Sequence, residues 1–76
     1  MQDIKVRFGK AVRRLRLERG YTQEGFAAKA KINRSYMGQI ERGEINITIE
    51  NAERIAVGLG LKIGELMSEI DKEERR

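Results

Sequence analysis

Residues 23–42, QEGFAAKAKINRSYMGQIER, decide the fold of this chain. Phe26, Ala27 and Ala30 recur at helical spacing in its first part, and Asn33, a residue type that caps helix N-termini, begins a second apolar pattern of the same period. Only about three residues separate the two patterns, so the two short helices that they predict must cross steeply. A steep crossing requires small residues at the contact, and Ala27 is placed where the helices come closest.

Apolar residues on both sides of this stretch predict three further helices. The first is expected over residues 3–19, where Gly20 closes it, and the next two over residues 23–30 and from Asn33 to Gly43. The fourth follows the N-cap residue Thr48 and ends near Gly60. Its inward positions are Ile49, Ala52, Ile55, Ala56 and Leu59. The chain is therefore expected to form an all-α, compact five-helix domain.

A last apolar stripe predicts a fifth, short helix near the C-terminus. It consists of Ile63, Leu66, Met67 and Ile70, and the charged residues 71–76 that follow are expected to fray. Lys62 stands at the expected N-cap position, and its side chain is not able to cap the helix. All 76 residues are expected to form one domain, because a chain of this length holds one small core.

Charge is distributed unevenly along the chain. Residues 1–42 carry 11 Lys and Arg against 4 Asp and Glu, whereas residues 43–76 carry 5 against 8, so the net charges are +7 and −3. A basic first half suits a polyanion, which favours nucleic acid as the partner of the N-terminal side.

The same composition argues against several other functions. The chain has no Cys and no His, so it offers no disulfide, no thiolate or imidazole metal site and no histidine base. Nothing pairs a nucleophile with a base, so an enzyme is not expected, and neither is a cofactor, a metal or a small-molecule ligand. No stretch reads as a signal peptide or a membrane span, and the expected location is the cytoplasm.

Four segments carry a resemblance to a known family. They read YTQE over residues 21–24, FAAKA over residues 26–30, NRSYMGQIERG over residues 33–43, and TIE with IAVGLG over residues 48–50 and 55–60. The sequence resembles the helix-turn-helix family of phage repressors and small bacterial regulators of the Cro/repressor type. Within that family it looks like the compact controller proteins of restriction-modification systems. The resemblance implies a transcriptional regulator that binds double-stranded DNA.

In such a fold the third helix enters the major groove with its N-terminal turn. Arg34 can then bond guanine and Gln39 adenine, each in bidentate fashion. The expected base-reading residues, all taken to face outward, are Asn33, Arg34, Ser35, Gly38 and Gln39. Gln23 resembles the family's phosphate clamp at a helix N-terminus. The expected phosphate-contacting residues are Thr22, Gln23, Tyr36, Arg42 and Asn46.

Two structural features are also implied by the resemblance. Arg16 and Glu41 correspond to a partly buried salt bridge of the family that joins the first helix to the end of the third. Lys31 stands at a turn position where the family commonly has Gly, because the backbone there is left-handed. The roles of Lys10, Arg13 and Arg14 are left open between phosphate contact and a solvated helix face.

One helix in one groove reads few base pairs, so a homodimer on a symmetric operator is expected. The partner surface that the resemblance implies lies in the fourth and fifth helices. Its candidates are Ile47, Ile63, Met67 and Ile70, whereas Leu66 is assigned to the core. The alternative from another class is a protein-interaction module, such as an antitoxin that uses this fold to grip a toxin.

Overall fold

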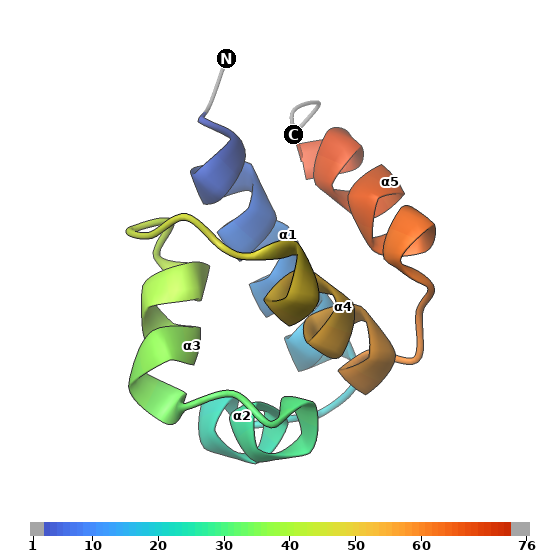
Figure 1. Ribbon diagram of the computed structural model, residues 1–76. Coiled ribbons are helices and arrows are strands. Elements are labelled where there is room, and N and C mark those ends of the chain that lie inside the picture. Colours follow the sequence, from blue (N-terminus) through green and yellow to red (C-terminus); the bar gives the residue numbers. More distant parts are fainter. Residues whose placement is uncertain (1–2, 74–76) are drawn as a thin grey trace.

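The computed structural model describes residues 3–73, and this part of the chain forms five helices and no strand (Figure 1). The helices are α1 (Ile4–Glu18), α2 (Gln23–Ala30), α3 (Arg34–Glu41), α4 (Ile49–Gly58) and α5 (Ile63–Glu73). Their radius of gyration is 11.0 Å, and their arrangement confirms the expected compact all-α fold.

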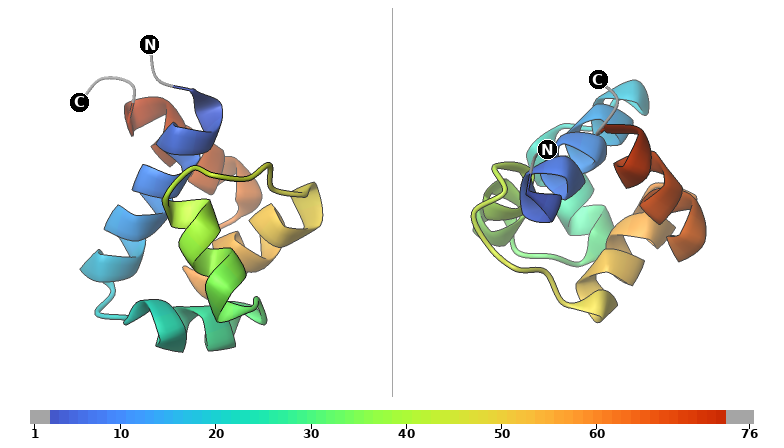
Figure 2. Two further views of the ribbon diagram at one scale, coloured as in Figure 1. Left: turned by 90° about the vertical axis from the view of Figure 1, so that its left-hand side faces the viewer. Right: turned by 90° about the horizontal axis from the view of Figure 1, so that it is seen from above.

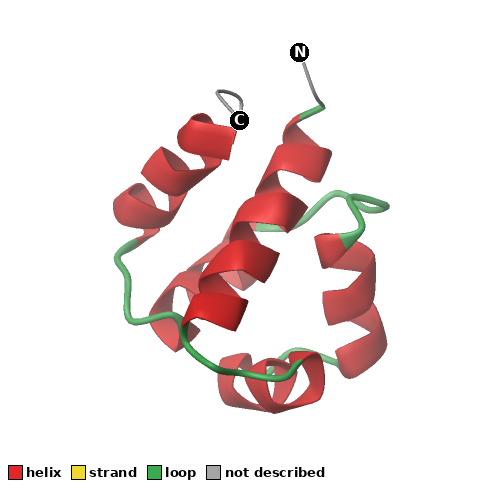
Figure 3. Ribbon diagram, turned by 180° about the vertical axis from the view of Figure 1, so that it is seen from behind, coloured by secondary structure: helices red, strands yellow, loops and turns green. Residues whose placement is uncertain are grey.

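Helix α1 lies at the centre of the arrangement. It packs against α3 on one side and α5 on the other, while α2 contacts α3 and α4, and α4 contacts α5 (Figures 1 and 2). The view from behind shows α2 closing one end of the molecule below α1 (Figure 3). Helix α3 therefore packs against α1 and α2 with one side, and its other side faces solvent.

Each of the five helices contributes a stripe of apolar residues to a single core. Phe26 of α2 and Met37 of α3 are completely buried, as are Val12, Ile55 and Leu66. Leu66 is thus confirmed as a core residue. Ile49, however, is 69% exposed, so its assignment to the inward face of the fourth helix is wrong. Ile49 is the first residue of α4 and lies outside the core. Ala52 and Ile55, which follow it in the same helix, are buried in the core.

Helix α1 approaches α3 most closely at Gly9. A Cβ atom added to Gly9 would lie 2.4 Å from the carbonyl oxygen of Ile40 and 2.6 Å from that of Glu41. Only glycine fits between these backbone atoms, and the contact sets the distance between α1 and the C-terminal end of α3.

The predicted N-caps are confirmed. The Thr22 hydroxyl accepts a hydrogen bond from the backbone N–H of Gly25 at 3.0 Å, and the Thr48 hydroxyl accepts one from Asn51 at 3.1 Å. Lys62 directly precedes α5, and its backbone N–H is bound by a side chain from the first turn of that helix. Glu65 accepts a hydrogen bond from the Lys62 N–H at 2.7 Å, which is the carboxylate half of a capping box.

The turn between α2 and α3 has the left-handed residue that the family resemblance implies. Lys31 adopts φ 60° and ψ 43° and is the only residue other than glycine with a positive φ within residues 3–73. A side chain in this conformation costs roughly 1 kcal/mol. The turn therefore keeps its geometry although it lacks the glycine that would adopt it without strain.

The end of α5 is tied to α1 by charge. Arg14 donates from Nε to Glu73 at 2.7 Å and from Nη2 to Glu69 at 3.0 Å. Burial disfavours the charge of Arg14, but these two carboxylates raise its pKa above the ordinary value. The expected fraying is wrong for residues 71–73, which continue α5, and residues 74–76 lie outside the described residues.

Residues 3–73 contain neither a membrane-spanning helix nor a cluster of metal-binding side chains. No helix there is long and apolar enough to cross a membrane. No group of three or more acidic, Cys or His side chains among these residues is placed to hold a metal ion.

Candidate nucleic-acid interface

A shallow hollow lies across the outer face of α3 and the first turn of α2. It is lined by Gln23, Arg34, Ser35, Gly38, Gln39 and Arg42. Four of the five predicted base-reading residues are in this group, together with two of the predicted phosphate-contacting residues. The helix crossing therefore brings side chains from the two short helices to one surface, which we call the recognition hollow.

Hydrogen-bonding side chains at the rim of the recognition hollow reach solvent. The Arg34 side chain is 70% exposed and lies 3.5 Å from the carboxylate of Glu24, which is 74% exposed. Ser35 is exposed and Gln39 is half-buried. An exposed pair of this kind holds its arginine weakly, so Arg34 is free to exchange Glu24 for another acceptor.

Gly38 lines the recognition hollow on the outer side of α3. It is buried, because the side chains of Arg42 and Gln23 lie over it. A Cβ at this position would lie 3.1 Å from Nη1 of Arg42 and 3.5 Å from Oε1 of Gln23. Gly38 thus forms the floor of the recognition hollow, and its missing side chain makes room for two neighbours that cover it.

A buried ion pair lies beside the recognition hollow, and it joins the two residues that the family resemblance pairs. Arg16 donates to both carboxylate oxygens of Glu41, from Nε at 2.7 Å and from Nη2 at 3.0 Å, and its Nη1 donates to the Tyr21 carbonyl at 2.9 Å. The two side chains are 8% and 4% exposed. Gln23 donates from Nε2 to Glu41 at 3.2 Å, which fixes the orientation of its amide. This network joins α1, α2 and α3.

The remaining predicted DNA-contacting residues lie elsewhere. Asn33 caps α3, and its Oδ1 accepts hydrogen bonds from the N–H groups of Ser35 and Tyr36 at 2.8 and 3.2 Å, so only its amide nitrogen is left to donate. Tyr36 is half-buried and packs against the core beside Asn33. Asn46 is exposed in the loop after α3 and lies outside the recognition hollow.

Glu44 pairs with Arg42 of the recognition hollow, a contact that the sequence did not predict. Arg42 donates to its carboxylate from Nε at 2.7 Å and from Nη2 at 3.3 Å. The hydrogen bond from Arg42 lowers the pKa of Glu44, and the same bond raises the pKa of Arg42. The sequence alone does not predict this ion pair. Arg42 and Glu44 are two positions apart where α3 passes into a loop, and the loop geometry decides whether their side chains meet.

The three basic residues of α1 whose role was left open, Lys10, Arg13 and Arg14, lie in different surroundings. Arg14 points to α5 and is bound there by glutamates. Arg13 lines a second hollow with Gln23 and Arg42, directly beside the recognition hollow. Lys10 is exposed. Of the three, Arg13 is the residue that the fold brings to the candidate interface.

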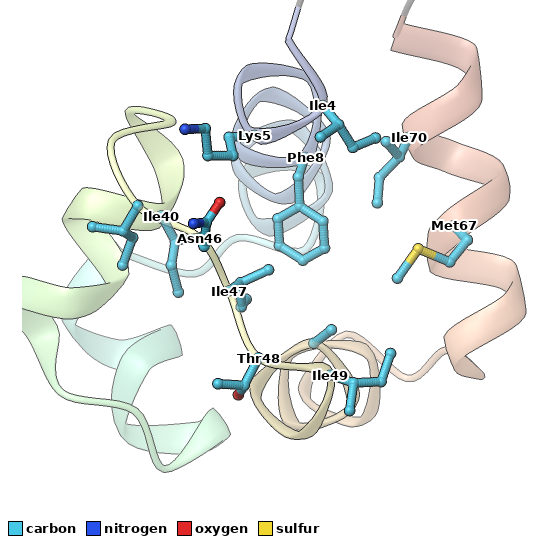
Figure 4. Close-up of a pocket in the computed structure, with 12 residues that line it drawn as sticks. Ile4, Lys5, Phe8, Ile40, Asn46, Ile47, Thr48, Ile49, Met67 and Ile70 are labelled. Carbon is cyan, nitrogen blue, oxygen red and sulfur yellow. The ribbon is translucent and has the colours of Figure 1, made fainter.

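A separate apolar groove lies between the start of α1, the loop from α3 to α4, and α5 (Figure 4). Phe8 lies in its middle, and Met67 and Ile47 approach the ring from opposite sides (Figure 4). The groove is lined by Ile4, Lys5, Phe8, Ile40, Ile45, Asn46, Ile47, Thr48, Ile49, Ala52, Met67 and Ile70. Asn46 lines this groove from the loop between α3 and α4, and its side chain is exposed.

Three of the four predicted partner-surface residues line this apolar groove, and two of them, Ile47 and Met67, expose part of their side chains. Ile47 is half-buried and Met67 is 37% exposed. Ile70 is 2% exposed, so its assignment to an exposed partner surface is wrong: it follows Leu66 by one helical turn and shares its core stripe. Ile63 is half-buried and lies outside the groove. The rim includes Ile4 and Ile49, which are 55% and 69% exposed.

Comparison with known proteins identifies the family. Residues 12–66 match the helix-turn-helix family model. The control protein C.MunI of a Mycoplasma species is 45% identical over 74 residues, which is 96% of this chain and 100% of that protein.

Two solved structures of restriction-modification controller proteins share the fold. C.AhdI from Aeromonas hydrophila has 37% identity and a TM-score of 0.78, and the match covers 82% of this chain and 94% of that one. C.Esp1396I bound to a 25 base pair operator site has 30% identity and a TM-score of 0.87 over 100% of both chains. The chain therefore belongs to the helix-turn-helix family of transcriptional regulators and is similar to the controller proteins of restriction-modification systems.

Proposed function

We propose that this protein is a sequence-specific DNA-binding transcriptional regulator of the restriction-modification controller type, which places α3 in the major groove and binds a symmetric operator as a homodimer. The recognition hollow carries the proposal, because it gathers hydrogen-bonding side chains on the free side of a short helix. C.Esp1396I has the same fold and is bound to a 25 base pair operator site, which supports DNA binding by this fold. A regulator of this kind would act in the cytoplasm.

Each group in the recognition hollow has a role that its chemistry suits. Arg34 is the residue for guanine, whose O6 and N7 accept a bidentate pair of hydrogen bonds, and Gln39 is the residue for adenine. Ser35 and the Asn33 amide serve neighbouring bases or phosphates. Gln23 lies at the N-terminus of α2, where the helix dipole favours a phosphate. One N–H of the Gln23 amide is bound by Glu41, which leaves the other for the DNA.

Replacement of Arg34 with alanine is expected to remove sequence preference at one base pair in each half-site. The lost bidentate contact corresponds to ~1–3 kcal/mol, or roughly a 5- to 150-fold loss of discrimination. Bound duplexes would first be selected from a randomised library. The preferred duplex and its single-base variants would then be titrated by fluorescence anisotropy with wild type and with Arg34→Ala.

Lys62→Ala is the matched control for this measurement, because Lys62 is an exposed cation at the start of α5, away from the recognition hollow. It removes the same charge and should leave base preference unchanged. A library that yields no enriched sequence, or an enriched sequence that Arg34→Ala reads as well as wild type does, would refute the major-groove orientation.

The dimer follows from the length of DNA that must be read. Two copies of α3 must be about 34 Å apart to enter successive major grooves on one face of the duplex. The apolar groove supplies a surface for this pairing, since Ile4, Ile49 and Met67 expose apolar area that a monomer would leave in water. A second copy would cover it.

Ile49→Glu is expected to convert the dimer to a monomer, because it places a charge at the rim of the apolar groove. Val57→Glu is the matched control: Val57 is also on α4 and is 68% exposed, but it lies outside the groove. Sedimentation velocity over a concentration series measures the association of both variants. Equal association of Ile49→Glu and wild type would place the interface elsewhere.

The exposed apolar groove also suits the second candidate, a protein-interaction module of the antitoxin kind. That candidate needs no operator, and its partner would cover the groove in place of a second copy. The library selection separates the two functions. A protein that enriches no duplex at low salt and remains monomeric would favour the interaction module.

A further inference from the structure

The contact between Arg42 and Glu44 leaves one edge of the guanidinium free. Arg42 is the C-cap residue of α3, and its Nε and Nη2 donate to the two carboxylate oxygens of Glu44. A guanidinium has five N–H groups in a fixed plane, so a carboxylate on the Nε side leaves the opposite edge, formed by Nη1 and the second N–H of Nη2, to donate elsewhere.

This free edge lies in the recognition hollow. Nη1 of Arg42 is 3.1 Å from the point that a Cβ of Gly38 would occupy, and Arg42 lines the hollow together with Gln39. The guanidinium therefore extends back along α3 over Gly38. Its position depends on two residues: the carboxylate of Glu44 holds one edge, and the missing side chain of Gly38 leaves space for the other.

We infer that Glu44 is a positioning residue for DNA recognition, which holds the guanidinium of Arg42 across Gly38 with its free edge toward the DNA. The inference rests on the proposed function. Arginine has a long, flexible side chain, and a residue that orders it before binding reduces the entropy lost on binding. Glu44 would thus increase affinity through Arg42 without touching the DNA.

The effect of removing Glu44 has a sign that separates this role from simple electrostatics. A carboxylate near DNA is repelled by the phosphates, so the loss of an exposed glutamate with no positioning role tightens binding, most strongly at low salt. The loss of a positioning glutamate weakens binding to the preferred duplex, because Arg42 becomes disordered. The two roles predict opposite changes in the dissociation constant.

The experiment compares Glu44→Ala with Glu50→Ala on the duplex that wild type selects. Glu50 is also exposed and lies in the first turn of α4 without contact to Arg42. Glu44→Ala is expected to weaken binding by roughly 5- to 10-fold, part of the range for one bidentate contact. Glu50→Ala should bind as wild type does or more tightly. Circular dichroism establishes that both variants are folded.

Two further variants test the path through Arg42. Gly38→Ala places a methyl group against Nη1 and should weaken binding as Glu44→Ala does, while helix α3 gains stability from the better helix former. In an Arg42→Ala background, Glu44→Ala should no longer weaken binding. If Glu44→Ala tightens binding, or weakens it equally without Arg42, the inference is wrong. The proposed function fails separately, if wild type selects no duplex.

Discussion

Glu41→Gln is expected to destabilise the protein by ~3–5 kcal/mol, because it leaves the buried charge of Arg16 without its counter-ion. The Arg16 side chain is 8% exposed, so water cannot replace the lost carboxylate. Glu41 also accepts a hydrogen bond from Gln23, and the variant disturbs that contact as well. Small domains have a total stability of about 5–15 kcal/mol, so much of this protein would unfold near physiological temperature.

Urea denaturation followed by circular dichroism measures this loss. Glu24→Gln is the matched control, since it breaks the exposed pair with Arg34 and should change the free energy of unfolding by less than about 1 kcal/mol. The double variant Arg16→Met/Glu41→Leu removes both charges and should recover most of the stability. If Glu41→Gln is no more damaging than Glu24→Gln, the buried ion pair is not what holds α1, α2 and α3 together.

The second large effect is expected at Gly9. Gly9→Ala requires a methyl group to fit where the carbonyl oxygens of Ile40 and Glu41 are 2.4 and 2.6 Å away. These are backbone atoms, so α1 and α3 must move apart. Overpacking of this kind typically costs about 1–3 kcal/mol and sometimes more.

Gly64→Ala is the same substitution in another helix and serves as its control. Nothing lies within 4 Å of a Cβ at Gly64, so alanine there should stabilise α5 by about 0.5–1 kcal/mol through helix propensity. The melting temperatures of the two variants should therefore shift in opposite directions. A Gly9→Ala variant that melts at or above the wild-type temperature would contradict the close approach of α1 to α3.

The helices could be predicted from the sequence because their signals are local. Thr22, Asn33 and Thr48 mark helix starts by a side chain that bonds the backbone of the next turn. Gly20, Gly43 and Gly60 follow helix ends in the left-handed conformation that glycine adopts without strain. The Arg16–Glu41 pair is different: it joins residues 25 positions apart, and only the family resemblance indicated it.

The errors concern the direction in which a residue faces, which depends on the neighbouring helices. Gly38 lies on the outer side of α3, but the long side chains of Gln23 and Arg42 cover it and leave it buried. Ile49 was expected in the core but is exposed, and Ile70 was expected on the partner surface but is buried. Helical periodicity shows which residues share a face of a helix, but it does not show where the core ends. The roles of Gly9 and Glu44 gave no sequence signal, since each is defined by the approach of a second segment.

The start of α1 and the end of α5 lie at the same end of the molecule, away from α2 (Figures 1 and 2). The apolar groove proposed for pairing also reaches the start of α1, through Ile4. Two copies could therefore be joined in tandem by a flexible linker that runs past the partner surface and leaves both recognition hollows open. Such a covalent pair would hold its two halves at an effective concentration of millimolar order, so dimerisation would no longer limit operator binding when the protein is scarce.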